Sequence, residues 1–142
     1  MKFTKGYWMN LPGVTNTDAV QVREVKVEND RVYLYTVPYH ADMRAMGGPL
    51  LEMYISSPQP DIIRTEAYHF MGGNQKMPAF ELNDAHCALE VENTETTVTI
   101  KSGNTKLVIG KNPCSFDYYY KDKKLTSIGN RFGNAMISTI ST

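Results

Sequence analysis

The chain has 142 residues, which is enough for one domain with a buried core. Its 15 basic and 15 acidic side chains cancel, so no net field attracts it to nucleic acid or to an anionic membrane. No segment approaches the roughly 18 apolar residues that a membrane-spanning helix needs. We therefore expect neither a nucleic-acid partner nor a membrane partner.

The N-terminus and the cysteines bear on the cellular compartment. Residues 1–5 lack an apolar run and a small-residue cleavage site, so we expect no signal peptide. Cys87 and Cys114 are too few for a disulfide-stabilised secreted scaffold. Cys87 has the strand parity of Leu89 and Val91, which predicts a small buried side chain. These observations predict a soluble cytoplasmic protein with two reduced, buried thiols.

Alternation of apolar and polar residues with a period of two begins near residue 20 and is typical of half-buried strands. The first predicted strand covers residues 20–27, and its valines change parity at Arg23-Glu24, which indicates a β-bulge or a strand break. A turn then leads to a partner strand at 31–37. The next strands are predicted at 50–55 and 62–70, separated by a proline-containing segment that cannot stay in a sheet.

The second half of the chain continues with short strands separated by turns rich in Gly, Asn and Asp. We predict these strands at residues 87–91, 97–100, 106–109, 115–120 and 124–128. No helix-period segment of useful length and no parallel βαβ rhythm is present. Eight or nine short strands at this spacing predict an all-β fold, a mainly antiparallel β-sandwich.

A set of short motifs gives the chain a family resemblance. Residues 6–13 have the pattern G-x-W-x-x-x-P-G, which resembles the opening of family 31 glycoside hydrolases, in particular the bacterial α-xylosidases. Further segments match that family in order along nearly the whole chain: Tyr35-Thr36-Val37-Pro38, Pro49-Leu50-Leu51, Tyr68-His69-Phe70, Glu92-Asn93-Thr94-Glu95, Lys101-Ser102-Gly103-Asn104, Ser115-Phe116-Asp117 and Leu125-Thr126. None is diagnostic alone, but their order is hard to obtain by chance.

The resemblance implies a galactose-mutarotase-like N-terminal domain. In this family two aspartates on a downstream (β/α)8 barrel carry out retaining hydrolysis of α-linked xylosides or glucosides. We therefore expect residues 1–129 to form the non-catalytic β-sandwich and residues 130–142 to begin a further strand or linker ahead of the barrel. No aspartate of this chain matches the catalytic motifs, so no catalytic residue and no cofactor is expected here. The expected partners are the chain's own barrel and, for a homo-oligomeric parent enzyme, further copies.

One loop is a candidate for the rim of the sugar pocket. In the family, a loop of this domain often reaches the active-site mouth, and here the corresponding segment is 39–48. Its only ionisable residues are His40, Asp42 and Arg44. The segment is slightly shorter than in the α-xylosidases that the chain resembles. Because of this departure, α-glucosidase or another α-glycosidase of the family stays open.

Aromatic residues are the candidates for direct sugar contact, because sugar C–H faces stack on exposed rings. The residues singled out are Trp8, Tyr118, Tyr119 and Tyr120. Consecutive strand residues point to opposite faces, so at least one of the three tyrosines is expected to pack inside. No metal site is expected, since His86-Cys87 beside Asp84 lacks the ligand spacing of a zinc site.

Two other classes of function stay open. An autonomous carbohydrate-binding module would bind sugar through exposed rings, and a partner-binding sandwich would have no connection to sugar. A large exposed apolar patch is expected either for the enzyme domain or for the partner-binding protein. Sugar titrations of the isolated chain distinguish the binding module from the other two classes.

Overall fold

The computed structural model describes residues 11–38, 50–69, 80, 85–129 and 138–141. Within these ranges the chain forms eleven β-strands and no helix. The all-β prediction is therefore confirmed for the part of the chain that the structure describes.

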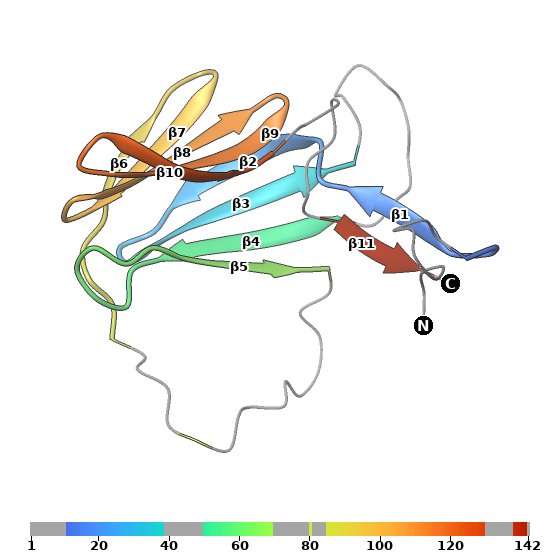
Figure 1. Cartoon of the computed structure of the whole chain (residues 1–142), viewed down its shortest axis with the longest axis horizontal. Helices are drawn as coiled ribbons and strands as arrows, with labels where there is room; N and C mark the ends of the chain where they lie inside the picture. The colour runs from blue at the N-terminus through green and yellow to red at the C-terminus, as the bar shows by residue number, and fades with distance from the viewer. Residues whose placement is uncertain (1–10, 39–49, 70–79, 81–84, 130–137, 142) are drawn as a thin grey trace.

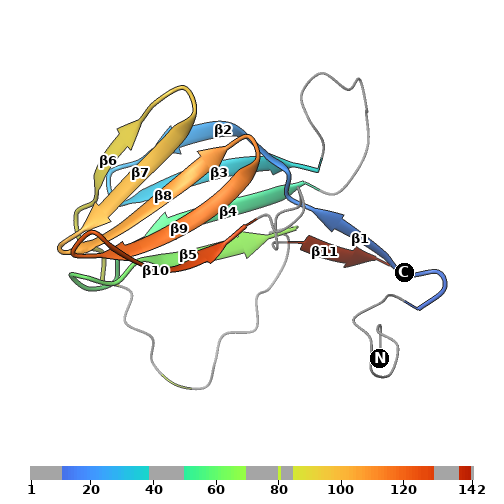
Figure 2. The same cartoon turned by 45° about the horizontal axis from the view of Figure 1, so that its top comes forward.

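Nine of the strands form two antiparallel sheets that lie over one another as two layers (Figures 1 and 2). The four-stranded sheet contains, in spatial order, β2 (Gln21–Val27), β3 (Arg31–Val37), β4 (Leu51–Ser56) and β5 (Arg64–Tyr68). The five-stranded sheet contains β6 (Glu90–Asn93), β7 (Thr97–Ser102), β8 (Thr105–Lys111), β9 (Cys114–Tyr120) and β10 (Lys123–Ile128). Each strand pairs with its neighbour in the sequence. The predicted β-sandwich is confirmed, and it is built from two successive meanders.

The other two strands form a separate ribbon. Strand β1 (Thr15–Asp18) pairs antiparallel with β11 (Ser138–Ser141), and the ribbon extends beyond one end of the sandwich (Figure 1). Sequence patterning does not predict β1, because its four residues are all polar or acidic and show no apolar alternation. The proposed domain boundary at residue 129 stays a prediction.

The core lies between the two sheets, and both contribute alternate residues to it. The inward-facing residues of the four-stranded sheet include Val22, Val32, Leu34, Leu51, Met53 and Ile55. Those of the five-stranded sheet are Val98, Ile100, Leu107, Ile109, Cys114 and Phe116. All of them are at most 6% exposed, so burial of apolar surface is the main force that holds the layers together.

One bulge and two tight turns shape the strands locally. The register of β2 against β3 shifts between Val22 and Glu24 within one continuous strand, so the structure has the bulge and not the strand break. The β7–β8 hairpin turns through Gly103-Asn104, and Gly103 has a φ of 57°. The β9–β10 hairpin turns through Lys121 and Asp122, whose φ values of 46° and 61° are those of a type I′ turn.

Two predicted strands are shorter in the structure. Strand β5 starts at Arg64 rather than at residue 62, and Phe70 lies outside the described residues. Strand β6 starts at Glu90, so Cys87 precedes the sheet instead of lying in it. Cys87 is free and half-buried, not buried as predicted, because it lies beyond the start of an edge strand and one side of it is open. Its backbone N–H instead donates to the carbonyl of Ser57, at 2.7 Å.

The loop after β4 holds the β7–β8 hairpin. The Asp61 carboxylate accepts hydrogen bonds from the backbone N–H and the side-chain amide of Asn104. The hydroxyl of Thr105 donates to the Asp61 carbonyl at 2.6 Å. Asp61 itself has a φ of 67°, a conformation that Asp adopts more readily than most residues. These hydrogen bonds join the four-stranded sheet to the five-stranded sheet at one end of the sandwich.

Candidate ligand-contact surface

Four of the residues predicted from the sequence as site residues lie outside the described part of the chain. These are Trp8 of the opening motif and His40, Asp42 and Arg44 of the rim loop. Their roles in sugar contact and at the active-site mouth therefore stay predictions.

The three consecutive tyrosines of β9 are dispersed over the sandwich. Tyr118 points inward, packs against the core and shares a 3.0 Å hydrogen bond with the hydroxyl of Thr65. Tyr119 lies on the opposite face of β9, where the Lys106 ammonium is 5.0 Å from its ring centroid. Tyr120 is 37% exposed at the strand end. The three rings therefore do not form one continuous surface.

A different set of tyrosines is brought together on the outer face of the four-stranded sheet. Strand register places Tyr33 of β3 directly opposite Tyr54 of β4, with ring centroids 5.3 Å apart and planes at 55°. The ring of Tyr68 on β5 meets that of Tyr54 nearly edge-on, at 6.1 Å and 67°. We call Tyr33, Tyr54 and Tyr68 the tyrosine row. All three side chains are partly exposed, so their rings are available on the surface.

The register explains why sequence reasoning missed this row. Tyr33, Tyr54 and Tyr68 are far apart in the sequence, and each alone looks like an ordinary strand residue. The one available signal is parity, because Tyr33 and Tyr54 alternate with buried neighbours on their own strands. The sequence neighbours of Tyr68 are exposed, so parity gives no such signal there. Only the pairing of β3, β4 and β5 brings the three rings within contact distance.

A hydrogen bond orients the Tyr33 end of the row. The Tyr33 hydroxyl donates to Oε1 of Glu52 at 2.9 Å. Burial first, and then this hydrogen bond to a carboxylate, raise the pKa of Tyr33 well above its ordinary value. The Lys26 ammonium lies 5.3 Å from the centroid of the same ring. Tyr33 is thus held as a neutral hydrogen-bond donor.

Polar side chains surround the Tyr54 end of the row. The Arg31 guanidinium lies 4.8 Å from the centroid of the Tyr54 ring, a cation–π arrangement. The Nε of Arg64 donates to Oγ of Ser56 at 3.1 Å and lies 3.3 Å from a carboxylate oxygen of Glu66. The other oxygen of Glu66 accepts a 3.0 Å hydrogen bond from the Tyr68 hydroxyl. The carboxylate therefore links the arginine to the tyrosine.

These side chains enclose a pocket of about 160 Å³ on the outer face of the sheet, which we call the Tyr54–Tyr68 pocket. Its lining residues are Arg31, Tyr54, Ser56, Arg64, Glu66, Tyr68 and His86. Three of the elements that contribute are strands in register, and His86 comes from the segment that precedes β6. Rings, guanidinium groups, a carboxylate, a hydroxyl and an imidazole thus converge on one small volume.

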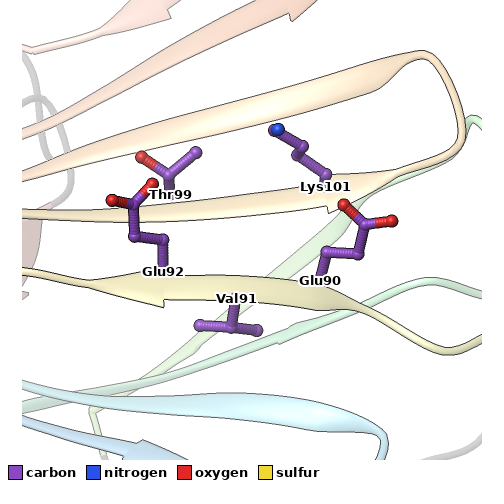
Figure 3. Close-up of a pocket in the computed structure, with 5 residues that line it drawn as sticks. All are labelled: Glu90, Val91, Glu92, Thr99 and Lys101. Carbon is purple, nitrogen blue, oxygen red and sulfur yellow. The ribbon is translucent and has the colours of Figure 1, made fainter.

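A second, larger hollow lies on the five-stranded sheet, over β6 and β7. Figure 3 shows Glu90, Glu92, Thr99 and Lys101 on one side of these strands, whereas Val91 points to the other side, toward the core. Its volume is about 220 Å³, but its surface is that of a solvated edge of a sheet, with charges of both signs and no ring.

Two searches of the described residues concern metal ions and membranes. Within them, no three His, Cys, Asp or Glu side chains come close enough together to hold a metal ion. A search of the same residues finds no helix long and apolar enough to cross a membrane.

Comparisons with known proteins bear on the fold. No model of a known protein family matches the chain. Among solved structures, the chain is similar to the cycloalternan-forming enzyme from Listeria monocytogenes in complex with a pentasaccharide substrate. The TM-score is 0.69 and the sequence identity 17%, over 90% of this chain and 11% of that enzyme.

An uncharacterized protein from Listeria monocytogenes EGD-e gives the same values, a TM-score of 0.69 and 17% identity over 90% of this chain and 11% of that one. Its structure in complex with α-D-glucose, β-D-glucose, magnesium and calcium matches with a TM-score of 0.68 and 15% identity, over 96% of this chain and 12% of that one. At such identities the likeness establishes the β-sandwich fold and not the activity. The chain spans only about a ninth of the length of these solved structures.

Proposed function

We propose that this chain is a non-catalytic N-terminal β-sandwich domain of a larger retaining α-glycosidase of family 31. The observation that carries the proposal is the structural match, which covers 90% of this chain but only 11% of an enzyme whose structure is in complex with a pentasaccharide substrate. A match that covers most of a short chain and little of a long one is expected when the short chain corresponds to one domain of a long enzyme. The ordered motifs from residue 6 to residue 126 support family 31 in particular.

In this proposal the chemistry belongs to the rest of the enzyme. Retaining hydrolysis uses two carboxylates about 5–5.5 Å apart, one as nucleophile and one as acid and base. The sandwich packs on the barrel that holds them, and segment 39–48 shapes one side of the active-site mouth. α-Xylosidase is the activity we favour, with α-glucosidase as the alternative, and the parent enzyme acts in carbohydrate metabolism as a homo-oligomer.

A cytoplasmic location is part of the same proposal. Both cysteines are free thiols, and Cys114 is fully buried, which suits a reducing compartment.

Two measurements test the proposal. The first is the length of the open reading frame beyond Thr142, where we expect several hundred further codons that include a barrel with paired aspartates. The second is an assay of the 142-residue chain with aryl α-xylosides and aryl α-glucosides, where we expect no hydrolysis. A stop codon directly after Thr142, or hydrolysis by this chain alone, would contradict the proposal.

The alternative function is an autonomous carbohydrate-binding module. The tyrosine row favours it, since a free-standing module needs partly exposed rings on a rigid sheet. A reading frame that stops after Thr142, together with sugar binding by the chain, would select this alternative over the enzyme domain.

A further inference from the structure

We propose that the Tyr54–Tyr68 pocket is a non-catalytic subsite that binds one ring of a neutral oligosaccharide. The inference deepens the proposed function, and it rests on that function only for the choice of α-linked glucose and xylose as first probes. The site itself is argued from the four-stranded sheet, without reference to any catalytic domain.

The size and support of the pocket suit a single sugar ring. Its volume of about 160 Å³ lies below the roughly 300–1,000 Å³ of sites for drug-sized ligands. Tyr54, Glu66 and Tyr68 lie on paired strands, and Glu66 is directly opposite Tyr54 in the register of β4 and β5. Side chains on paired strands are held more firmly than those on loops, so little order must be gained on binding.

The lining groups match both surfaces of a sugar. A pyranose has apolar C–H faces and a rim of hydroxyl groups. The partly exposed rings of Tyr54 and Tyr68 offer apolar surface with a polar tip, which is the chemistry of amphipathic binding surfaces. The face of Tyr54 that lies under the Arg31 guanidinium is not part of this surface. Arg64 and Glu66 offer planar donors and acceptors, which suit adjacent hydroxyls of a sugar.

The charges of the pocket cancel, which favours a neutral ligand over an anion. Arg31 pairs with Glu28, and Arg64 lies 3.3 Å from Glu66. The imidazole of His86 lies 3.5 Å from the carboxylate of Asp30. Each basic side chain of the lining therefore already has a carboxylate beside it. A phosphate or carboxylate ligand would have to compete with these carboxylates, whereas hydroxyl groups can add to the existing hydrogen bonds.

The existing hydrogen bonds also hold the binding groups in position. Glu66 accepts from the Tyr68 hydroxyl at 3.0 Å, and Arg64 donates to Ser56, which is 2% exposed. Because the carboxylate of Glu66 is fixed from two sides, removal of its charge should weaken sugar binding without removing a ring. A variant of Glu66 therefore tests the hydrogen bonds of the site separately from the stacking on its rings.

The test is a calorimetric or NMR titration of the 142-residue chain with maltotriose, isomaltotriose and an α-xyloside. We expect weak, saturable binding to at least one of them. Tyr54→Ala should weaken it at least about tenfold, since one ring face is lost from a small site. Glu66→Gln should weaken it while the thermal unfolding temperature stays close to that of the parent chain. This second variant keeps the test valid if Tyr54→Ala does not fold.

The matched control is Tyr119→Ala, which removes a ring from the outer face of the other sheet. We expect binding by this variant to be unchanged. Flat titrations with all the sugars would overturn the subsite, as would binding that is lost only in Tyr119→Ala. Tighter binding of glucose 6-phosphate than of glucose would contradict the neutral-ligand argument.

These outcomes are separable from those that test the proposed function. Flat titrations together with a continuing reading frame would remove the subsite and leave the enzyme-domain proposal standing. Binding that depends on Tyr54, in a chain whose reading frame stops, would support the subsite and remove the enzyme-domain proposal.

Discussion

Ser57 and Ser102 join the two sheets by a buried hydrogen bond with a defined direction. Their hydroxyl oxygens are 2.7 Å apart, and the residues are 0% and 3% exposed. The Ser57 hydroxyl donates its single proton to the carbonyl of Gln59, at 2.7 Å. Ser102 must therefore be the donor to Ser57. Ser57 follows β4 and Ser102 ends β7, so the bond links one layer of the sandwich to the other.

This direction predicts an asymmetry between two alanine variants. Ser57→Ala leaves the buried Ser102 hydroxyl without its acceptor, and should lower the free energy of unfolding by about 1–3 kcal/mol. Ser102→Ala removes a donor but leaves Ser57 bonded to Gln59. It should therefore lower the free energy of unfolding by less than Ser57→Ala does. Urea unfolding of both variants and of the double variant measures the coupling, with Ser127→Ala on the exposed face of β10 as the control. Equal costs for the two single variants would contradict the assigned direction.

Gly103 is predicted to tolerate no side chain. Its φ of 57° is unfavourable for alanine, and an added Cβ would collide with the Asp61 carboxylate. Gly103→Ala should therefore destabilise the chain by about 1–3 kcal/mol. The collision with the carboxylate is absent when Asp61 is replaced by alanine. Gly103→Ala should therefore lower the free energy of unfolding by less in an Asp61→Ala background than in the parent chain. Thermal unfolding of the four variants of this cycle tests the prediction, and strict additivity would show that the collision does not matter.

The two thiols should react at different rates. Cys114 is 0% exposed, and burial raises the pKa of its thiol to about 12. Cys87 is half-buried near the start of an edge strand. Under native conditions at mildly alkaline pH, a thiol reagent such as Ellman's reagent should modify Cys87 first and leave Cys114 protected. Both should react in denaturant, and Cys87→Ser should remove the fast phase. Fast modification of Cys114 in the native chain would contradict its burial.

Stability should fall at alkaline pH because of Cys114. Its folded pKa of about 12 is above the ordinary value of 9.0, so between these values the unfolded state loses a proton that the folded state keeps. The contribution of the protonated thiol is therefore fully present below about pH 9 and is lost as the pH rises above it. Urea unfolding from pH 8 to pH 10 should show this loss, and Cys114→Ala should flatten it. Above pH 10, Tyr33 adds a second loss, because burial raises its pKa as well.

The sequence predicts the sandwich well, because half-buried strands carry their own signal. The change of parity at Arg23-Glu24 locates the bulge, and the alternation of the predicted strand 50–55 gives Leu51, Met53 and Ile55 one face, which the structure buries. The β7–β8 turn follows from Gly103-Asn104. In each case the information is local, since parity and turn chemistry depend on residues next to one another.

The parts that sequence reasoning missed depend on pairing between distant segments. Thr15–Asp18 becomes a strand only because Ser138–Ser141 lies beside it. The tyrosine row exists only in the register of three strands, whereas Tyr118 and Tyr119, adjacent in the sequence, point to opposite faces. Neighbours in sequence are easy to notice, but in a strand they are the residues least able to share a surface.

The two layers of the sandwich occupy two uninterrupted stretches of the chain, 21–68 and 90–128. No strand of one sheet is inserted between strands of the other. A single cut in the stretch between them would therefore yield two polypeptides, each with a complete meander and one bare apolar face. Neither fragment could bury that face alone, so the two should recover their structure only by binding each other. The core of this protein is thus arranged like an interface between two proteins, although both sheets belong to one chain.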